Sequence, residues 1–188
     1  MNSNGLSVLF LLFRNTCNID LQCRVFVEQL KLAVKWCKPI VIHSRNAYTK
    51  TFEVMKQILQ MNHPIHLHCF LGTMDDVQLF TSYFTNIKFG FTPLITRGNV
   101  MHAVLQQLHL TQILSETDSP YFVPEEVTPL DSISKRFIGI SFQLSRHSRT
   151  GHPGMVYSVV ETIGQLRRIS VVEVARQLKE NAYSIYGI

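Results

Sequence analysis

The chain lacks the features that mark secreted proteins, membrane proteins and zinc fingers. Its four cysteines form neither a CxxC pair nor a zinc-finger spacing, so we expect reduced thiols in the nucleus or cytoplasm rather than disulfides. No apolar run approaches the roughly 20 residues that span a bilayer. The apolar stretch 6–13 has no basic residue before it and no clear cleavage site after it, which favours a core strand over a secretory signal.

The sequence also lacks glycine-rich phosphate loops: no such loop follows any predicted strand. This absence weakens the case for an open nucleotide-binding sheet. The composition is that of one globular domain, with 46% hydrophobic and 16% charged residues. The net charge of +5 suits an anionic partner such as nucleic acid, but it decides neither the fold nor the chemistry.

What the sequence does contain is an alternation of helical and extended periodicity from Val25 onward. The apolar spacing predicts helices over 25–36, 47–61, 73–84, 98–108, 153–168 and 171–184. Short β-branched or apolar runs predict strands over 40–44, 65–70, 87–91 and 112–118. Strands separated by helices and covered on both faces indicate a parallel α/β sheet. An open doubly wound sheet and part of a (β/α)₈ barrel both fit this pattern.

Polar side chains stand at the ends of three predicted strands. His43 ends the first, His68 lies near the end of the second, and Asp118 ends the last. The carboxyl ends of parallel strands meet at one edge, where such proteins do their chemistry. Histidine and carboxylate together offer the mixed nitrogen and oxygen ligands that divalent ions accept. We therefore predict His43, His68 and Asp118 as metal ligands.

Two further polar residues lie one step before these ligands. Residues two apart on a strand face the same way, so Glu116 shares a face with Asp118, and His66 shares one with His68. We expect Glu116 to orient a ligand. His66 is placed behind His68, with a ligand role as the alternative.

Two arginines are candidates for phosphate binding. Arg45 follows the first histidine, and Arg149 belongs to a basic segment between residues 135 and 152. A solvated basic loop explains the second segment equally well.

Several segments resemble a known family. PIVIHSRNA (39–47), HCFLGT (68–73) and ETDSPYFVP (116–124) are similar to three signature blocks of the TatD family of metal-dependent deoxyribonucleases. GHPGMVYSVVETIGQL (151–166) and Asn181-Ala182 fit the closing region of that family, and the GHPG form is most similar to its TATDN2-type branch. The resemblance runs from about Val25 to the end of the chain.

The resemblance implies a (β/α)₈ barrel whose two divalent ions, Mg²⁺, Mn²⁺ or Zn²⁺, support phosphodiester hydrolysis. His43 and His68 would bind one ion. Asp118 would bind the other and position or deprotonate the attacking water, which makes it the expected catalytic residue. The implied partner is nucleic acid, with DNA preferred to RNA, and no membrane; the oligomeric state is left open.

The sequence also departs from the family. The HxH strand and the bridging Glu that open the family are missing, Asn46 stands where an acid is usual, and a complete barrel needs about 250 residues. We therefore expect residues 1–24 to be a divergent segment and 25–188 the C-terminal part of a TatD-like hydrolase domain, about the last five strands with their helices. The candidate functions are a TatD-type nuclease, a catalytically inactive truncated relative and, third, an amidohydrolase-type lactonase or amidase.

Overall fold

Five parallel strands form the centre of the molecule. The computed structural model describes the backbone of residues 8–12 and all atoms of 18–98, 101–125 and 150–187. Within these residues the sheet has the order β1-β2-β3-β4-β5. Its strands are β1 (Val8–Leu12), β2 (Ile40–Arg45), β3 (Ile65–His68), β4 (Ile87–Phe91) and β5 (Ile113–Ser115).

Strand β1 comes from the apolar stretch near the start of the chain. It pairs in parallel with β2, and Phe10 is the Cα partner of His43. The prediction of a strand within residues 6–13 is therefore confirmed.

The two faces of the sheet carry different residues because side chains alternate along each strand. One row across the sheet is completely apolar and at most 1% exposed, and it consists of Ile42, Leu67, Phe89 and Ile113. The row one residue further along the chain faces the other way. It contains His43 and His68, which are Cα partners on β2 and β3. The register itself thus places the two histidines side by side.

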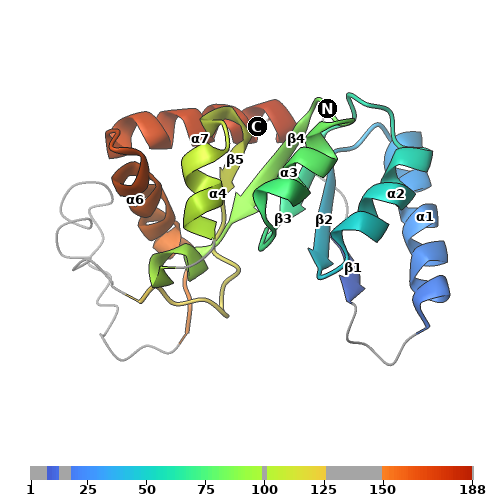
Figure 1. Ribbon diagram of the computed structural model, residues 1–188, viewed down its shortest axis with the longest axis horizontal. Helices are drawn as coiled ribbons and strands as arrows, with labels where there is room; N and C mark the ends of the chain where they lie inside the picture. The colour runs from blue at the N-terminus through green and yellow to red at the C-terminus, as the bar shows by residue number, and fades with distance from the viewer. Residues whose placement is uncertain (1–7, 13–17, 99–100, 126–149, 188) are drawn as a thin grey trace.

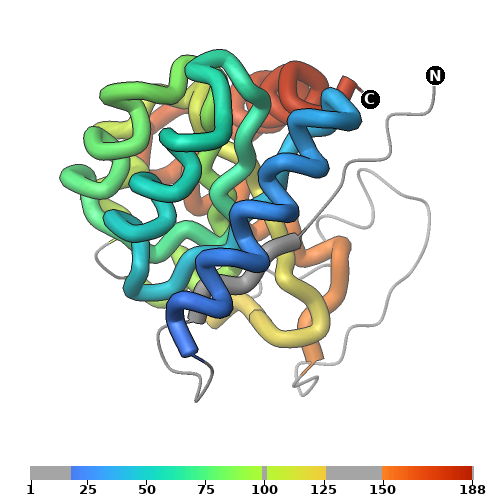
Figure 2. Tube along the Cα trace, turned by 90° about the vertical axis from the view of Figure 1, so that its right-hand side faces the viewer, coloured from blue at the N-terminus to red at the C-terminus, as the bar shows by residue number. Residues whose placement is uncertain are grey.

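Helices connect and flank the strands of the sheet (Figure 1). They are α1 (Ile19–Lys35), α2 (Tyr48–Ile58), α3 (Met74–Thr81), α4 (Met101–Gln107), α6 (Val156–Arg167) and α7 (Val171–Tyr186). Short 3₁₀ turns lie at η1 (Pro93–Arg97), η2 (Leu110–Gln112) and η3 (Pro153–Met155). Helices α1 to α4 follow one another along the sheet, with α6 and α7 at the β5 end (Figure 1). Figure 2 shows the same arrangement from the side of α1.

Local signals fix where two of these helices begin. Thr73 precedes α3 and forms a capping box with Asp76, whose carboxylate accepts a hydrogen bond from Thr73 N–H at 2.8 Å. Helix α1 begins at Ile19, six residues before the predicted start. The reason is Asn18, whose side chain accepts a hydrogen bond from the backbone of Asp20 at 2.8 Å.

Two strands are shorter than predicted. The run expected over 65–70 ends at His68, and the run expected over 112–118 ends at Ser115. Cys69 and Asp118 have φ angles of 46° and 48°, in the left-handed region that a strand cannot contain. Glu116 and Asp118 therefore do not share a strand face.

No described helix is both long and apolar enough to cross a membrane.

Candidate metal centre

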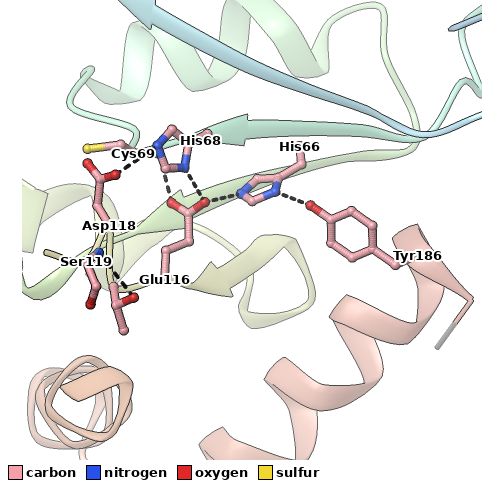
Figure 3. Close-up of polar contacts among 8 residues, drawn as sticks. His66, His68, Cys69, Glu116, Asp118, Ser119 and Tyr186 are labelled. Atoms are coloured by element: carbon pink, nitrogen blue, oxygen red, sulfur yellow. Dashed lines mark hydrogen bonds and ion pairs between the residues drawn. The ribbon is translucent and has the colours of Figure 1, made fainter. Parts of the chain in front are cut away.

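A buried carboxylate and two histidines form the centre of the site. Oε1 of Glu116 accepts a hydrogen bond from Nδ1 of His68 at 2.6 Å. Its other oxygen accepts one from the backbone N–H of Cys69 at 2.8 Å. Nε2 of His66 lies 2.8 Å from Oε1, although its direction falls outside hydrogen-bond geometry. These contacts hold Glu116 between β3 and the end of β5 (Figure 3).

The charge of Glu116 is stabilised by these neighbours. Burial of the carboxyl group raises its pKa, but the close imidazoles of His66 and His68 outweigh burial and lower the pKa of Glu116 to about 2. Burial also lowers the pKa of His68, whereas Glu116 and then Asp118 raise it, and the net direction is upward. An ionised Glu116 therefore keeps a proton on Nδ1 of His68.

The opposite nitrogen of His68 faces Asp118. Nε2 of His68 lies 3.7 Å from Oδ1 of Asp118, whose side chain is 28% exposed. The positive φ of Asp118 turns the chain after β5, and its carbonyl accepts a hydrogen bond from Tyr121 N–H at 2.9 Å. This turn, rather than strand alternation, aims the carboxylate at the histidine.

His43 completes the group predicted from the sequence. Its ring centroid lies 5.6 Å from that of His68, with the planes tilted by 45°. Burial and the neighbouring His68 lower the pKa of His43 and favour the neutral imidazole that a metal ion requires. The structure thus brings His43, His68 and Asp118 together at the carboxyl ends of β2, β3 and β5.

His68 belongs to two groups of possible ligand residues: an inner group with His66 and Glu116, and an outer group with His43 and Asp118. The ligand atoms of the inner group lie within 4.8 Å of one another and so are capable of holding a metal ion. However, its nitrogens are 2.6 and 2.8 Å from a single oxygen, which is hydrogen-bond spacing. Ligands that share an ion at about 2.1 Å stand about 3 Å or more apart. In the outer group, Nε2 of His68 and Oδ1 of Asp118 are 3.7 Å apart, a separation that leaves room for an ion between these two atoms.

Gly90 supplies the room for the inner group. A Cβ atom on Gly90 would stand 2.2 Å from Oε2 of Glu116 and 2.4 Å from Nε2 of His66. The strand pattern gave no reason to single out this glycine. The approach of Glu116 from the end of β5 and of His66 from β3 makes it necessary.

Of the two arginines predicted to bind phosphate, the structure describes only Arg45. Arg45 is the last residue of β2 and is exposed at the same edge of the sheet as His43. Arg149 lies outside the described residues, as does most of the basic segment that contains it.

Sequence reasoning missed Tyr186, the last residue of α7. Its hydroxyl forms a short hydrogen bond with Nδ1 of His66. A tyrosine 120 positions away carries no local signal for this contact, and the predicted helix ended at residue 184, before Tyr186.

Together these features define a class of protein, namely a partial β/α barrel with a histidine and carboxylate cluster at the carboxyl ends of its strands. The family model described as TatD related DNase matches residues 10–187. The chain belongs to the TatD-related DNase family.

Relatives and solved structures agree with this assignment. The chain is 31% identical to the human 3'-5' RNA nuclease TATDN2, over 94% of this chain and 21% of the relative. It is 26% identical to the Escherichia coli K12 3'-5' ssDNA/RNA exonuclease TatD, over 93% of this chain and 62% of the relative. The chain thus spans less than two thirds of either protein.

Two crystal structures share the fold. The TatD homologue YJJV from Escherichia coli superimposes with a TM-score of 0.75 at 23% identity, covering 98% of this chain and 63% of that one. A TatD family hydrolase from Entamoeba histolytica gives a TM-score of 0.72 at 17% identity, covering 94% of this chain and 59% of that one. Both comparisons confirm the prediction of a partial barrel.

Proposed function

We propose that the chain is a metal-dependent nuclease that hydrolyses phosphodiester bonds with ions held by His43, His68 and Asp118. The observation that carries the proposal is that the two ring nitrogens of His68 face different partners. Its Nδ1–H is fixed by Glu116, so the lone pair of Nε2 points to the side where Asp118 and His43 lie.

Each residue has a distinct part in this chemistry. A bound divalent ion would polarise the phosphoryl oxygens and offset the charge that develops on them. Glu116 keeps His68 in one tautomer and one orientation. Asp118, partly exposed to solvent, positions the attacking water and accepts its proton. Arg45, at the same edge, binds a phosphate of the substrate.

The substrate we infer is a single-stranded nucleic acid. The bacterial relatives are named for ssDNA and RNA, and the human relative for RNA. A net charge of +5 suits such a polyanion. The preference for DNA over RNA stays a prediction, so the assay must include both.

The second candidate is a relative that binds metal or nucleic acid without catalysis. It is favoured by the sequence itself, because the only HxH pair is His66–His68, both members of which already contact Glu116.

One experiment separates the candidates. Single-stranded DNA and RNA are incubated with the protein and Mg²⁺ or Mn²⁺, alongside His68→Ala and the control His109→Ala, in which an exposed histidine that caps η2 is removed. Cleavage lost only in His68→Ala supports the nuclease. No cleavage above that of His68→Ala favours the inactive relative, and turnover of a small ester with nucleic acid left intact indicates a lactonase.

A second assay tests the ligands directly. His43→Ala should weaken Mn²⁺ binding measurably, because one of the proposed nitrogen ligands is lost. Equal affinity in the variant and the unsubstituted protein would count against this ligand set.

A further inference from the structure

Helix α7 reaches the metal centre through one side chain. The Tyr186 hydroxyl bonds to Nδ1 of His66, and the two rings meet edge to face with centroids 6.0 Å apart. His66 in turn lies against Glu116, and Glu116 against His68. A continuous row of contacts therefore runs from the C-terminal helix to the proposed metal ligand (Figure 3).

The position of Tyr186 is fixed by the way α7 docks. Asn181, which is 3% exposed, donates hydrogen bonds to the carbonyls of Leu110 at 2.8 Å and Ile113 at 2.7 Å. Ile113 is the first residue of β5, so α7 is anchored to the strand that leads to Glu116. Tyr186 follows five residues after this anchor.

The contacts define the direction of each hydrogen bond. Burial raises the pKa of Tyr186, so its hydroxyl keeps its proton and is able to donate it to Nδ1 of His66. The neutral imidazole of His66 then carries its proton on Nε2, beside the Glu116 carboxylate. An Nε2 without a proton would turn its lone pair towards the lone pairs of Oε1, 2.8 Å away, and the two atoms would repel each other. Glu116 is left to accept from Nδ1 of His68 and from Cys69 N–H.

We propose that Tyr186 and His66 are positioning residues, through which docking of α7 sets the orientation of Glu116 and His68 at the metal centre. This inference rests on the proposed function, in that His68 is taken as a metal ligand. Removing the Tyr186 hydroxyl leaves Nδ1 of His66 without its donor. The imidazole is then free to move its proton to Nδ1, which turns a lone pair towards Glu116 and loosens the carboxylate.

The competing interpretation makes His66 itself a ligand of an ion in the inner group. In that case the number of bound ions falls when His66 is replaced. A positioning role changes affinity and leaves the number of bound ions unchanged.

The test compares Tyr186→Phe with Tyr183→Phe, a matched control on the same helix whose side chain is 63% exposed. The protonation of the histidine nitrogens is read by ¹⁵N NMR on the metal-free protein, and Mn²⁺ affinity is measured by titration calorimetry. Tyr186→Phe should move the His66 signals away from the Nε2–H tautomer and weaken Mn²⁺ binding about tenfold, as loss of an outer partner of a metal ligand does. Tyr183→Phe should change neither.

A third variant, His66→Gln, keeps the test decisive. It should weaken Mn²⁺ binding with the same number of ions bound, whereas loss of a bound ion would overturn the positioning role. Unchanged tautomer and affinity in Tyr186→Phe would overturn it as well. Mn²⁺ binding without cleavage would remove the nuclease proposal alone, because neither readout depends on turnover.

Discussion

At the scale of single residues, Gly90 leaves space that no other residue can leave. The carboxylate of Glu116 occupies the position where a Cβ atom would stand, and it is held there by Cys69 N–H and two histidines. A substitution that adds a methyl group cannot be accommodated by swinging Glu116 away without breaking those contacts.

Gly90→Ala should therefore lower the free energy of unfolding by about 1–3 kcal/mol, the usual cost of overpacking, and weaken Mn²⁺ binding. Urea denaturation and calorimetry measure the two effects. Gly154→Ala is the control, because the nearest atom to its Cβ, Nδ1 of His152, is 3.2 Å away. Equal unfolding midpoints for the two variants would show that Glu116 is not confined as described.

Tyr48 makes a second residue-scale test, away from the metal centre. Burial raises the pKa of Tyr48 from 10.0 to about 12, and its hydroxyl accepts a hydrogen bond from Leu71 N–H at 3.0 Å. Below pH 10 the group is protonated in both states and its contribution to stability is complete. Above pH 10 the unfolded chain loses the proton first, so stability falls until the folded group ionises near pH 12.

The unsubstituted protein should lose about 1 kcal/mol more stability than Tyr48→Phe between pH 9 and pH 11. Urea denaturation at several pH values measures this difference. Tyr183→Phe, an exposed tyrosine, should follow the unsubstituted protein. A parallel pH dependence in all three proteins would contradict the role given to burial of Tyr48.

At the scale of elements, α7 joins the end of the chain to the sheet. Its buried face carries Val174, Leu178 and Ile185, with Asn181 as the one polar member of that face. The side-chain amide of Asn181 donates hydrogen bonds to one carbonyl in η2 and one in β5, and its own oxygen accepts a hydrogen bond from the Gln177 side chain at 3.0 Å. A buried amide with every group bonded fixes the position of the helix along the sheet.

Asn181→Ala should lower the free energy of unfolding by about 2–4 kcal/mol, because the carbonyls of Leu110 and Ile113 each lose one hydrogen bond at a site closed to solvent, and Leu110 keeps only the one from Ile113 N–H. It should also weaken Mn²⁺ binding, since Tyr186 loses its anchor. Arg176→Ala is the control on the exposed face of α7. It removes a surface pair with Glu180 at 2.9 Å and should cost less than about 0.5 kcal/mol. Similar losses in both variants would argue against the anchoring role.

At the scale of the whole molecule, the excess of positive charge bears on substrate binding. A net charge of +5 attracts a polyanion, and each phosphate that a basic side chain neutralises releases counterions. Binding of nucleic acid should therefore weaken as salt concentration rises. Arg45, the last residue of β2, is a described arginine at the edge of the sheet where the proposed ligands lie.

Arg45→Ala should reduce the slope of log affinity against log salt by about 0.7 for a single-stranded DNA. Fluorescence anisotropy with Ca²⁺ in place of Mg²⁺ measures binding while limiting cleavage. Arg24→Ala, an exposed arginine on α1, should keep the original slope. An unchanged slope in Arg45→Ala would remove this residue from the phosphate contacts.

The sequence predicted much of this architecture because periodicity reports burial locally. The strand over 87–91 has the predicted bounds, and the parallel α/β class follows from apolar runs of that length. The sequence also placed His43, His68 and Asp118 at one edge, and the structure finds them as near neighbours. Their role as ligands stays a prediction.

The order of the strands and helices and the residue types at the strand ends were thus determined by the sequence alone, since each depends on neighbours a few positions away. Only the tertiary structure decided the contact of Tyr186 with His66, the requirement for a residue without a Cβ atom at position 90, and the direction in which the Asp118 side chain points. Each of these depends on how elements far apart in the chain pack together, or on a backbone turn that alternation cannot report. Side-chain contacts between distant segments are set by packing geometry, which no local period encodes.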